Sequence, residues 1–161
     1  MELLGCGSTK VVTASGNRAI ARPRSPDVAR RLRREAAWLR MFRGSTYLLC
    51  SVAATQTRNE LTLPRARHGS LTDLLDSMEF DNKRLSNRHF DEIVKQVNHG
   101  LDELQSYGLR HNDLRPQNVL VFDFSHDDAS ATQIKICDFE DVRTGPRDDI
   151  QKFVELFQAL L

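Results

Sequence analysis

The sequence has no long hydrophobic run, few cysteines and almost no net charge. No stretch approaches the roughly 18 apolar residues of a bilayer-spanning helix, and the first residues have the pattern of a strand rather than of a secretory leader. The 3 cysteines lack metal-ligand spacing, and such an odd, sparse set predicts a reducing compartment. With 23 basic and 22 acidic residues, net charge does not favour nucleic acid or a membrane surface as a partner.

The length and the local charge add two expectations. A chain of 161 residues fits one domain and is long enough to bury a core. Residues 18–43 contain nine arginines against two acidic residues, Asp27 and Glu35. We expect a solvated helix face there, with a phosphate or an acidic partner as the alternative.

The most informative segment is residues 109–118, LRHNDLRPQN, which precedes an apolar run at 119–122. A carboxylate that orients a hydroxyl and an amide that holds a metal, five residues apart, suit phosphoryl transfer. The segment resembles the catalytic loop of protein kinases, H-R-D-L-K-P-x-N, with Asn112 for the arginine and Arg115 for the lysine. The resemblance implies that Asp113 orients the acceptor hydroxyl, that Arg115 neutralises charge on the transferred phosphoryl group, and that Asn118 binds Mg²⁺.

A second resemblance lies near the N-terminus, in residues 5–12, GCGSTKVV. Gly5 and Gly7 allow backbone N–H groups to approach phosphate oxygens, and Val12 can cover an adenine ring. The segment resembles the kinase glycine-rich loop, G-x-G-x-x-G-x-V, with Lys10 in the third glycine position. A tight turn at 15–17 then predicts paired strands at 11–14 and 18–22.

The strand at 18–22 departs from the family, because the usual phosphate-binding lysine is missing. Aligning V-A-I-K with residues 18–21 leaves Ala21 in the lysine position and turns Ala19 toward the adenine. Aligning it with 19–22 places Arg22 there but turns the bulkier Ile20 to the adenine, so we favour the first register. The cation then comes from Lys10, as in the similar with-no-lysine kinases, or from Arg22; the alternative is that the cation has been lost.

A helix is predicted from Pro26 to Phe42 by its N-terminal proline and by apolar residues at helical spacing, and Gly44 ends the segment. Glu35 is the acidic residue within its body. The resemblance implies that Glu35 matches the glutamate of kinase helix C, which holds the lysine.

The middle of the chain predicts strands at 47–54 and 60–63 and then resembles a kinase hinge at 64–69. Leu63 corresponds to the gatekeeper residue. The Pro64 carbonyl and the Ala66 N–H correspond to the groups that bind the adenine edge. A short helix at 71–77 follows, with Ser70 and Asp73 as its cap.

The C-terminal part predicts a long amphipathic helix at 88–107 and a strand pair at 119–122 and 134–136. The next segment, Asp138-Phe139-Glu140, resembles the kinase D-F-G segment with Glu140 for glycine, which implies Mg²⁺ binding by Asp138. Residues 148–150 and the apolar residues after them resemble the start of kinase helix F. The resemblance implies that Asp149 is the aspartate that holds the catalytic loop from below. No A-P-E segment lies between.

These motifs occur in kinase order and imply an α+β, two-lobed, protein kinase-like fold. Its parts are a β-rich N-lobe with one helix (1–63), a hinge (64–69) and a reduced helical C-lobe ending at helix F (70–161). Bacterial effector kinases, other minimal kinases and some fungal kinase-like proteins are similar. We therefore expect the cytoplasm, or a host cytosol, as the compartment.

Two functions are compatible with the resemblance. The first is a Ser/Thr protein kinase that uses ATP and Mg²⁺ and is constitutive or triggered by a partner. The second is a pseudokinase that regulates or mimics a kinase by contact and still binds nucleotide. A protein substrate or partner is expected in both cases, including a partner that covers the truncated C-lobe, and nucleic acid is not expected.

Overall fold

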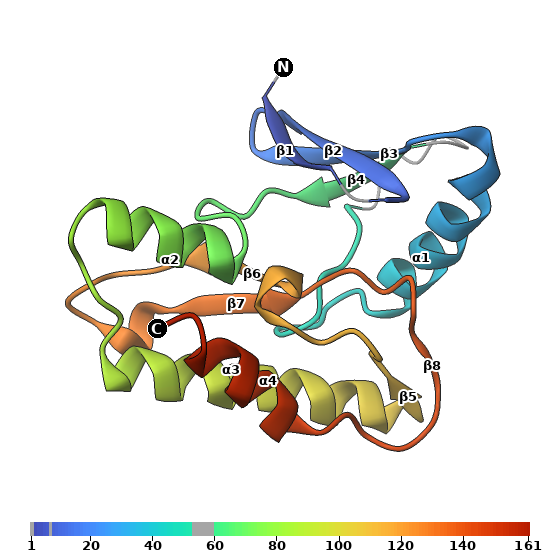
Figure 1. Ribbon diagram of the computed structural model, residues 1–161. Helices are drawn as coiled ribbons and strands as arrows, with labels where there is room; N and C mark the ends of the chain where they lie inside the picture. Colours follow the sequence, from blue (N-terminus) through green and yellow to red (C-terminus); the bar gives the residue numbers. More distant parts are fainter. Residues whose placement is uncertain (1, 7, 53–59) are drawn as a thin grey trace. The chain divides into compact units, whose positions relative to one another are not determined.

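The computed structural model describes residues 2–6, 8–52 and 60–161, which fold as two compact units (Figure 1). The first unit comprises Met1–Ser45, Leu49–Arg65 and Asp138–Glu140, and the second comprises Thr46–Leu48, Ala66–Cys137 and Asp141–Leu161. The chain passes between the units at 45–46, 48–49, 65–66, 137–138 and 140–141.

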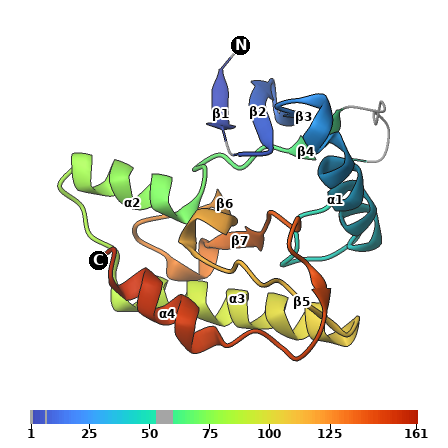
Figure 2. The same ribbon diagram turned by 45° about the vertical axis from the view of Figure 1, so that its right-hand side comes forward.

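The first unit is built on a four-stranded antiparallel sheet. Its strands follow the order β1 (Leu3–Cys6), β2 (Lys10–Ser15), β3 (Arg18–Pro23) and β4 (Leu61–Pro64), and they lie side by side in Figure 2. The turn between β2 and β3 is closed by Gly16, whose φ of 60° favours glycine. The predicted pairing of residues 11–14 with 18–22 is confirmed.

One helix accompanies this sheet. A 3-10 turn at Pro26–Val28 leads into α1 (Ala29–Met41), which buries Leu32, Ala36 and Leu39 on one side. Its arginines lie on the exposed side, as expected for a solvated helix face. The helix ends before Gly44, whose φ is 88°.

The strand predicted at residues 47–54 is not present over the described residues 47–52. The Tyr47 carbonyl accepts from Ile136 N–H (2.8 Å), the Ser51 N–H donates to the Leu39 carbonyl (3.3 Å), and the Val52 N–H donates to the Thr62 carbonyl (3.0 Å). Because successive backbone groups bond to different elements, no continuous ladder forms. The remainder of the predicted strand and its polar turn fall in residues 53–59, outside the described residues.

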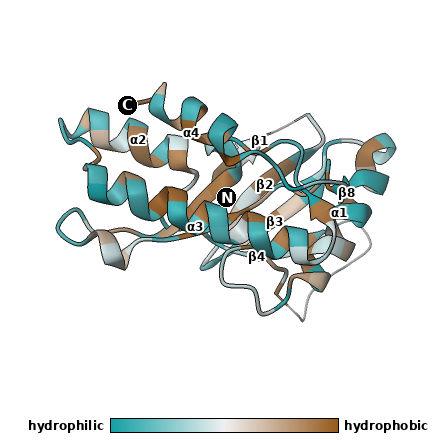
Figure 3. Ribbon diagram, turned by 90° about the horizontal axis from the view of Figure 1, so that it is seen from below, coloured by the Kyte–Doolittle hydropathy of each residue, from teal (hydrophilic) through white to brown (hydrophobic). Residues whose placement is uncertain are grey.

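Three helices form much of the second unit. They are α2 (Leu71–Phe80), α3 (Asn87–Ser106) and α4 (Ile150–Gln158). The predicted Ser70 and Asp73 cap is present as a reciprocal capping box, and α2 continues three residues beyond the expected end. Figure 3 shows polar and apolar stretches along these helices, and Phe90 of α3 stacks on Phe157 of α4 with ring centroids 4.7 Å apart.

Two short strand pairs complete the second unit. The predicted pairing of residues 119–122 with 134–136 is confirmed as β6 (Val119–Asp123) against β7 (Gln133–Ile136). A second pair joins β5 (Leu109–Arg110) to β8 (Arg143–Thr144). Within the described part of the chain, no helix combines the length and apolar character needed to cross a membrane.

Candidate active site

Lys10 begins β2 and shares a sheet face with the small residues of β3. Residues directly opposite each other in an antiparallel pair have side chains on the same face, and the register pairs Val12 with Ala21. Alternation along each strand then places Lys10, Val12, Ala19 and Ala21 on one face. The face that carries Ala21, where kinases have a lysine, is thus also the face of Lys10.

The Lys10 ammonium lies among three carboxylates of the first unit. Its Nζ is 2.5 Å from Glu35 Oε2, 3.5 Å from Asp138 Oδ1 and 3.7 Å from Glu140 Oε1. The three acids each offer an oxygen within 4.8 Å of the others, and we refer to Glu35, Asp138 and Glu140 as the acidic cluster. The Glu35 side chain is only 3% exposed, so this pair lies in a region of weak solvent screening.

Burial and neighbouring charges act in opposite directions on Lys10. Burial, the largest single effect, lowers the pKa of Lys10, but the attraction of Glu35, Asp138 and Glu140 together outweighs it and raises the pKa above its ordinary value of 10.5. Burial also raises the pKa of the Glu35 carboxyl, and the ion pair with Lys10 opposes that rise. Lys10 therefore remains a full positive charge.

Arg22, the other candidate for the phosphate-binding cation, lies on the opposite face of the sheet. Its guanidinium bonds Glu60 at 2.6 Å and the Thr13 hydroxyl at 3.3 Å. Both members of the Arg22–Glu60 pair are more than a third exposed. The structure thus brings Lys10, and not Arg22, to Glu35.

Glu35 also contacts the Asp138–Glu140 segment through its second oxygen. Its Oε1 accepts a hydrogen bond from the Phe139 N–H at 3.3 Å. The Phe139 ring is fully buried and meets Phe42, just beyond α1, edge to face at a centroid distance of 4.8 Å. Asp138 has a φ of 63°, an uncommon conformation for a residue other than glycine.

The residues predicted to surround the adenine can be placed on the sheet. Gly5 lies opposite Val12, and a side chain at Gly5 would meet nothing within 4 Å. Leu63 lies opposite Ala19, and both are nearly buried. Gly7 lies outside the described residues.

The predicted hinge residues divide between the two units. Pro64 ends β4 opposite Arg18 in the first unit. Ala66 belongs to the second unit, where its carbonyl accepts from the Gly69 N–H at 3.4 Å.

The predicted catalytic loop lies wholly in the second unit and brings its three candidate residues together. The Asn118 side-chain amide donates to the Asp113 backbone carbonyl (2.7 Å) and to Asp113 Oδ2 (3.2 Å). Arg115 Nε is 3.4 Å from Asp113 Oδ1, with the arginine side chain half-exposed. Because its N–H₂ is engaged with Asp113, Asn118 presents its carbonyl oxygen as the remaining polar atom.

A buried histidine fixes the backbone of this loop. His111 Nδ1 accepts from the Asp113 N–H at 3.2 Å, so the ring hydrogen lies on Nε2, which bonds the Cys137 carbonyl at 2.9 Å. The Cys137 N–H in turn donates to the backbone carbonyl of Asn118 at 2.9 Å.

The expectation that Asp149 holds the catalytic loop is wrong, because Asp148 does so. Asp148 Oδ2 accepts from the His111 N–H (2.6 Å) and Oδ1 accepts from the Asn112 N–H (2.9 Å). Asp149 instead caps α4 by accepting from the Gln151 N–H. The sequence held the signal that separates them, since an aspartate directly before a helical run is the preferred N-cap.

Asn112, which stands where kinases have an arginine, adopts a left-handed backbone with φ of 70°. Its side-chain amide donates to the Asp141 carbonyl at 2.9 Å. Asparagine tolerates this conformation better than most residues, so the substitution suits the local geometry.

Thr9 was not singled out in the sequence but belongs to the Lys10 site. Its hydroxyl donates to Glu140 Oε1, and the residue is 7% exposed. The two residues are 131 positions apart, so no local pattern could pair them.

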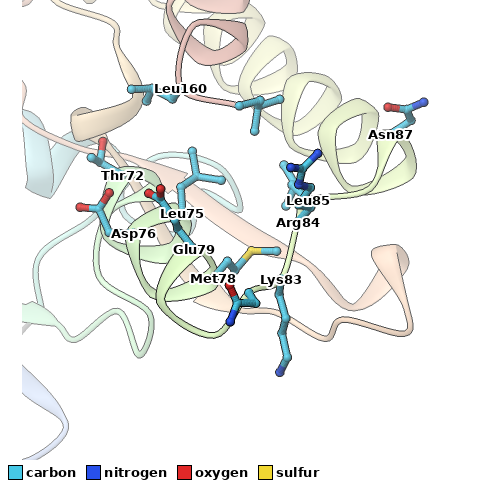
Figure 4. Close-up of a pocket in the computed structure, with 12 residues that line it drawn as sticks. Thr72, Leu75, Asp76, Met78, Glu79, Lys83, Arg84, Leu85, Asn87 and Leu160 are labelled. Atoms are coloured by element: carbon cyan, nitrogen blue, oxygen red, sulfur yellow. The ribbon is translucent and has the colours of Figure 1, made fainter.

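A pocket of about 740 Å³ elsewhere in the second unit contains none of the predicted site residues. Figure 4 shows its walls, which include side chains of α2, the connection to α3, and Leu160. Leu161 also lines the pocket.

The chain is similar in sequence to known protein kinases. A family model described as the protein kinase domain matches residues 9–154. The chain is 34% identical over 80 residues to a probable serine/threonine-protein kinase of Schizosaccharomyces pombe. The aligned region covers 48% of this chain and 9% of that protein. It is 28% identical over 148 residues to the mitogen-activated protein kinase mpkA of Aspergillus fumigatus, covering 83% of this chain and 31% of that protein. For the mitogen-activated protein kinase MPS1 of Pyricularia oryzae the identity is 29% over 120 residues, covering 70% and 26%.

The chain belongs to the protein kinase domain family. Its α+β architecture, with an N-terminal antiparallel sheet and a helix-rich second unit, is consistent with a kinase fold. The chain matches less than a third of the length of each of these three relatives.

Proposed function

We propose that this chain is an ATP- and Mg²⁺-dependent phosphotransferase that acts on serine or threonine hydroxyls of a protein. The observation that supports this most is the Lys10–Glu35 ion pair beside Asp138. Lys10 supplies a positive charge for nucleotide phosphates even though β3 has no lysine. The catalytic loop adds an aspartate, Asp113, that contacts both an arginine and an asparagine.

The donor set of the chain suits magnesium. Mg²⁺ prefers oxygen ligands, and the Asp138 carboxylate and the Asn118 amide carbonyl are of that kind. The Asn118 N–H₂ group is turned to Asp113, which leaves the oxygen as the ligand atom. When bound, the ion neutralises charge on the β- and γ-phosphates.

The remaining residues have separate roles in this proposal. Lys10 binds the phosphates and Glu35 orients it, while Val12, Ala19 and Leu63 surround the adenine. The Pro64 carbonyl and the Ala66 N–H bind the adenine edge. Asp113 orients the acceptor hydroxyl and accepts its proton, and Arg115 offsets charge on the transferred group.

We also propose that activity does not require phosphorylation of the segment after Asp138. Many kinases use an arginine before the catalytic aspartate to bind such a phosphate. Asn112 occupies that position, and its amide is engaged with the Asp141 carbonyl.

A kinase-domain module that binds nucleotide without transferring phosphate is the second candidate. The observation in its favour is that Glu140 already pairs with Lys10, the cation proposed to bind phosphate. The same Glu140 oxygen accepts a hydrogen bond from the Thr9 hydroxyl. The two candidates differ in turnover and not in fold.

Transfer of γ-phosphate to serine and threonine peptides by wild type and by Asp113→Ala separates them. Loss of a proton-accepting side chain lowers such rates by about 100-fold or more. Asp127→Ala, the same change on an exposed loop, is the matched control and retains wild-type transfer. Mg²⁺-dependent ATP binding with no transfer above the Asp113→Ala level contradicts the enzyme and supports the binding module.

A further inference from the structure

Glu140 replaces a glycine of the D-F-G pattern and makes two contacts that a glycine cannot make. Its Oε1 accepts the hydroxyl hydrogen of Thr9, and the same oxygen lies 3.7 Å from Lys10 Nζ. Both contacts join residues more than 120 positions apart within the first unit. They fasten the start of β2 to the segment that follows β7.

The setting makes these contacts stronger than contacts on an open surface. The side chains of Glu140 and Lys10 are 15% and 16% exposed, and Thr9 is nearly buried. Weak solvent screening strengthens both the hydrogen bond and the attraction between the charges. The backbone of Thr9 is held as well, since its carbonyl accepts from the Arg24 N–H at 2.9 Å.

The same contacts oppose an incoming polyphosphate. A phosphate that pairs with Lys10 must displace or share the ammonium with Glu140, and the carboxylate repels the phosphate charge at short range.

We propose that Glu140 and Thr9 form an autoinhibitory latch, which holds Thr9 and the start of β2 to the Asp138–Glu140 segment and must open before Lys10 can bind nucleotide phosphate. The structural half of this proposal needs no nucleotide. The inhibitory half rests on the proposed function.

The structural half is tested by amide hydrogen exchange of residues 8–15 in the nucleotide-free protein. Thr9→Val removes the donor hydroxyl at constant shape, and Glu140→Gln removes the charge at constant size. We expect both to speed exchange in this segment, while Thr9→Ser, which retains the hydroxyl, exchanges like wild type. Thr13→Val, the same change within β2, where the hydroxyl accepts from Arg22 and has no contact with Glu140 among the described residues, is the matched control. Equal exchange in Thr9→Val and Thr13→Val overturns the latch.

The inhibitory half is tested by ATP affinity at fixed Mg²⁺. Removing one partly buried charge contact predicts about fivefold tighter binding for Glu140→Gln than for wild type. Weaker binding by this variant shows instead that Glu140 positions Lys10 for nucleotide, and overturns the proposal. If wild type and every variant fail to bind ATP, the proposed function and the inhibitory half both fail, and the exchange measurement still decides whether the contact restrains the loop.

Discussion

Lys10 is the residue on which the first unit's electrostatics depend. It balances a carboxylate that is almost completely buried, and burying one charge without its partner is far more costly than burying the pair. Arg22 also forms an ion pair, but in a setting that water reaches. The two cations therefore differ in what they contribute to stability.

Lys10→Met is expected to lower the free energy of unfolding by about 3–5 kcal/mol, because it leaves Glu35 buried without its cation. Urea unfolding followed by circular dichroism measures this change. Arg22→Met is the matched control, and its loss is expected to stay below about 1 kcal/mol because the Arg22–Glu60 pair is exposed. Equal losses in the two variants would show that the Lys10 pair does not stabilise the fold in the way described.

At the scale of elements, the start of α4 and the catalytic loop depend on adjacent aspartates with different tasks. Asp148 accepts two backbone N–H groups of the loop, and Asp149 caps the helix. A carboxylate has two accepting oxygens, whereas an asparagine amide has only one.

Asp148→Asn is therefore expected to destabilise the protein by about 1–3 kcal/mol, since one buried backbone donor loses its acceptor. Asp149→Asn is expected to change stability little, because asparagine and aspartate are similar N-caps. Thermal unfolding of both variants checks the assignment. A larger loss of stability from Asp149→Asn than from Asp148→Asn would contradict the assignment of Asp148 as the residue that holds the catalytic loop.

The elements that the sequence predicted well are those whose signals are local. The turn at Gly16, the capping box of α2 and the apolar stripe of α3 each follow from neighbouring residues, and each is present. The strand predicted at 47–54 was wrong over its described part because its backbone bonds are made with α1, β4 and β7, which an apolar run cannot specify.

The candidate site shows the same division between local and distant information. The sequence pattern alone placed Lys10 in the glycine-rich segment. Deciding that Lys10, and not Arg22, pairs with Glu35 required the register of β2 and β3. The contact of Thr9 with Glu140 could not be predicted from the sequence, because the two residues are 131 positions apart.

At the scale of the whole molecule, the chain forms two units that each present one part of the proposed machinery. The first unit contains Lys10, Glu35 and Asp138, and the second contains Asp113, Arg115 and Asn118. Each part is internally bonded, so each set of side chains is preorganised within its own unit.

We propose Lys10, rather than Arg22, as the phosphate-binding cation in place of a β3 lysine. Calorimetric titration of wild type, Lys10→Met and Arg22→Met with ATP and Mg²⁺ tests it most directly, at a temperature where circular dichroism shows all three folded. Losing a charge-assisted contact to phosphate predicts at least about tenfold weaker binding for Lys10→Met, with Arg22→Met close to wild type. Loss of binding in Arg22→Met with Lys10→Met unaffected would contradict the claim.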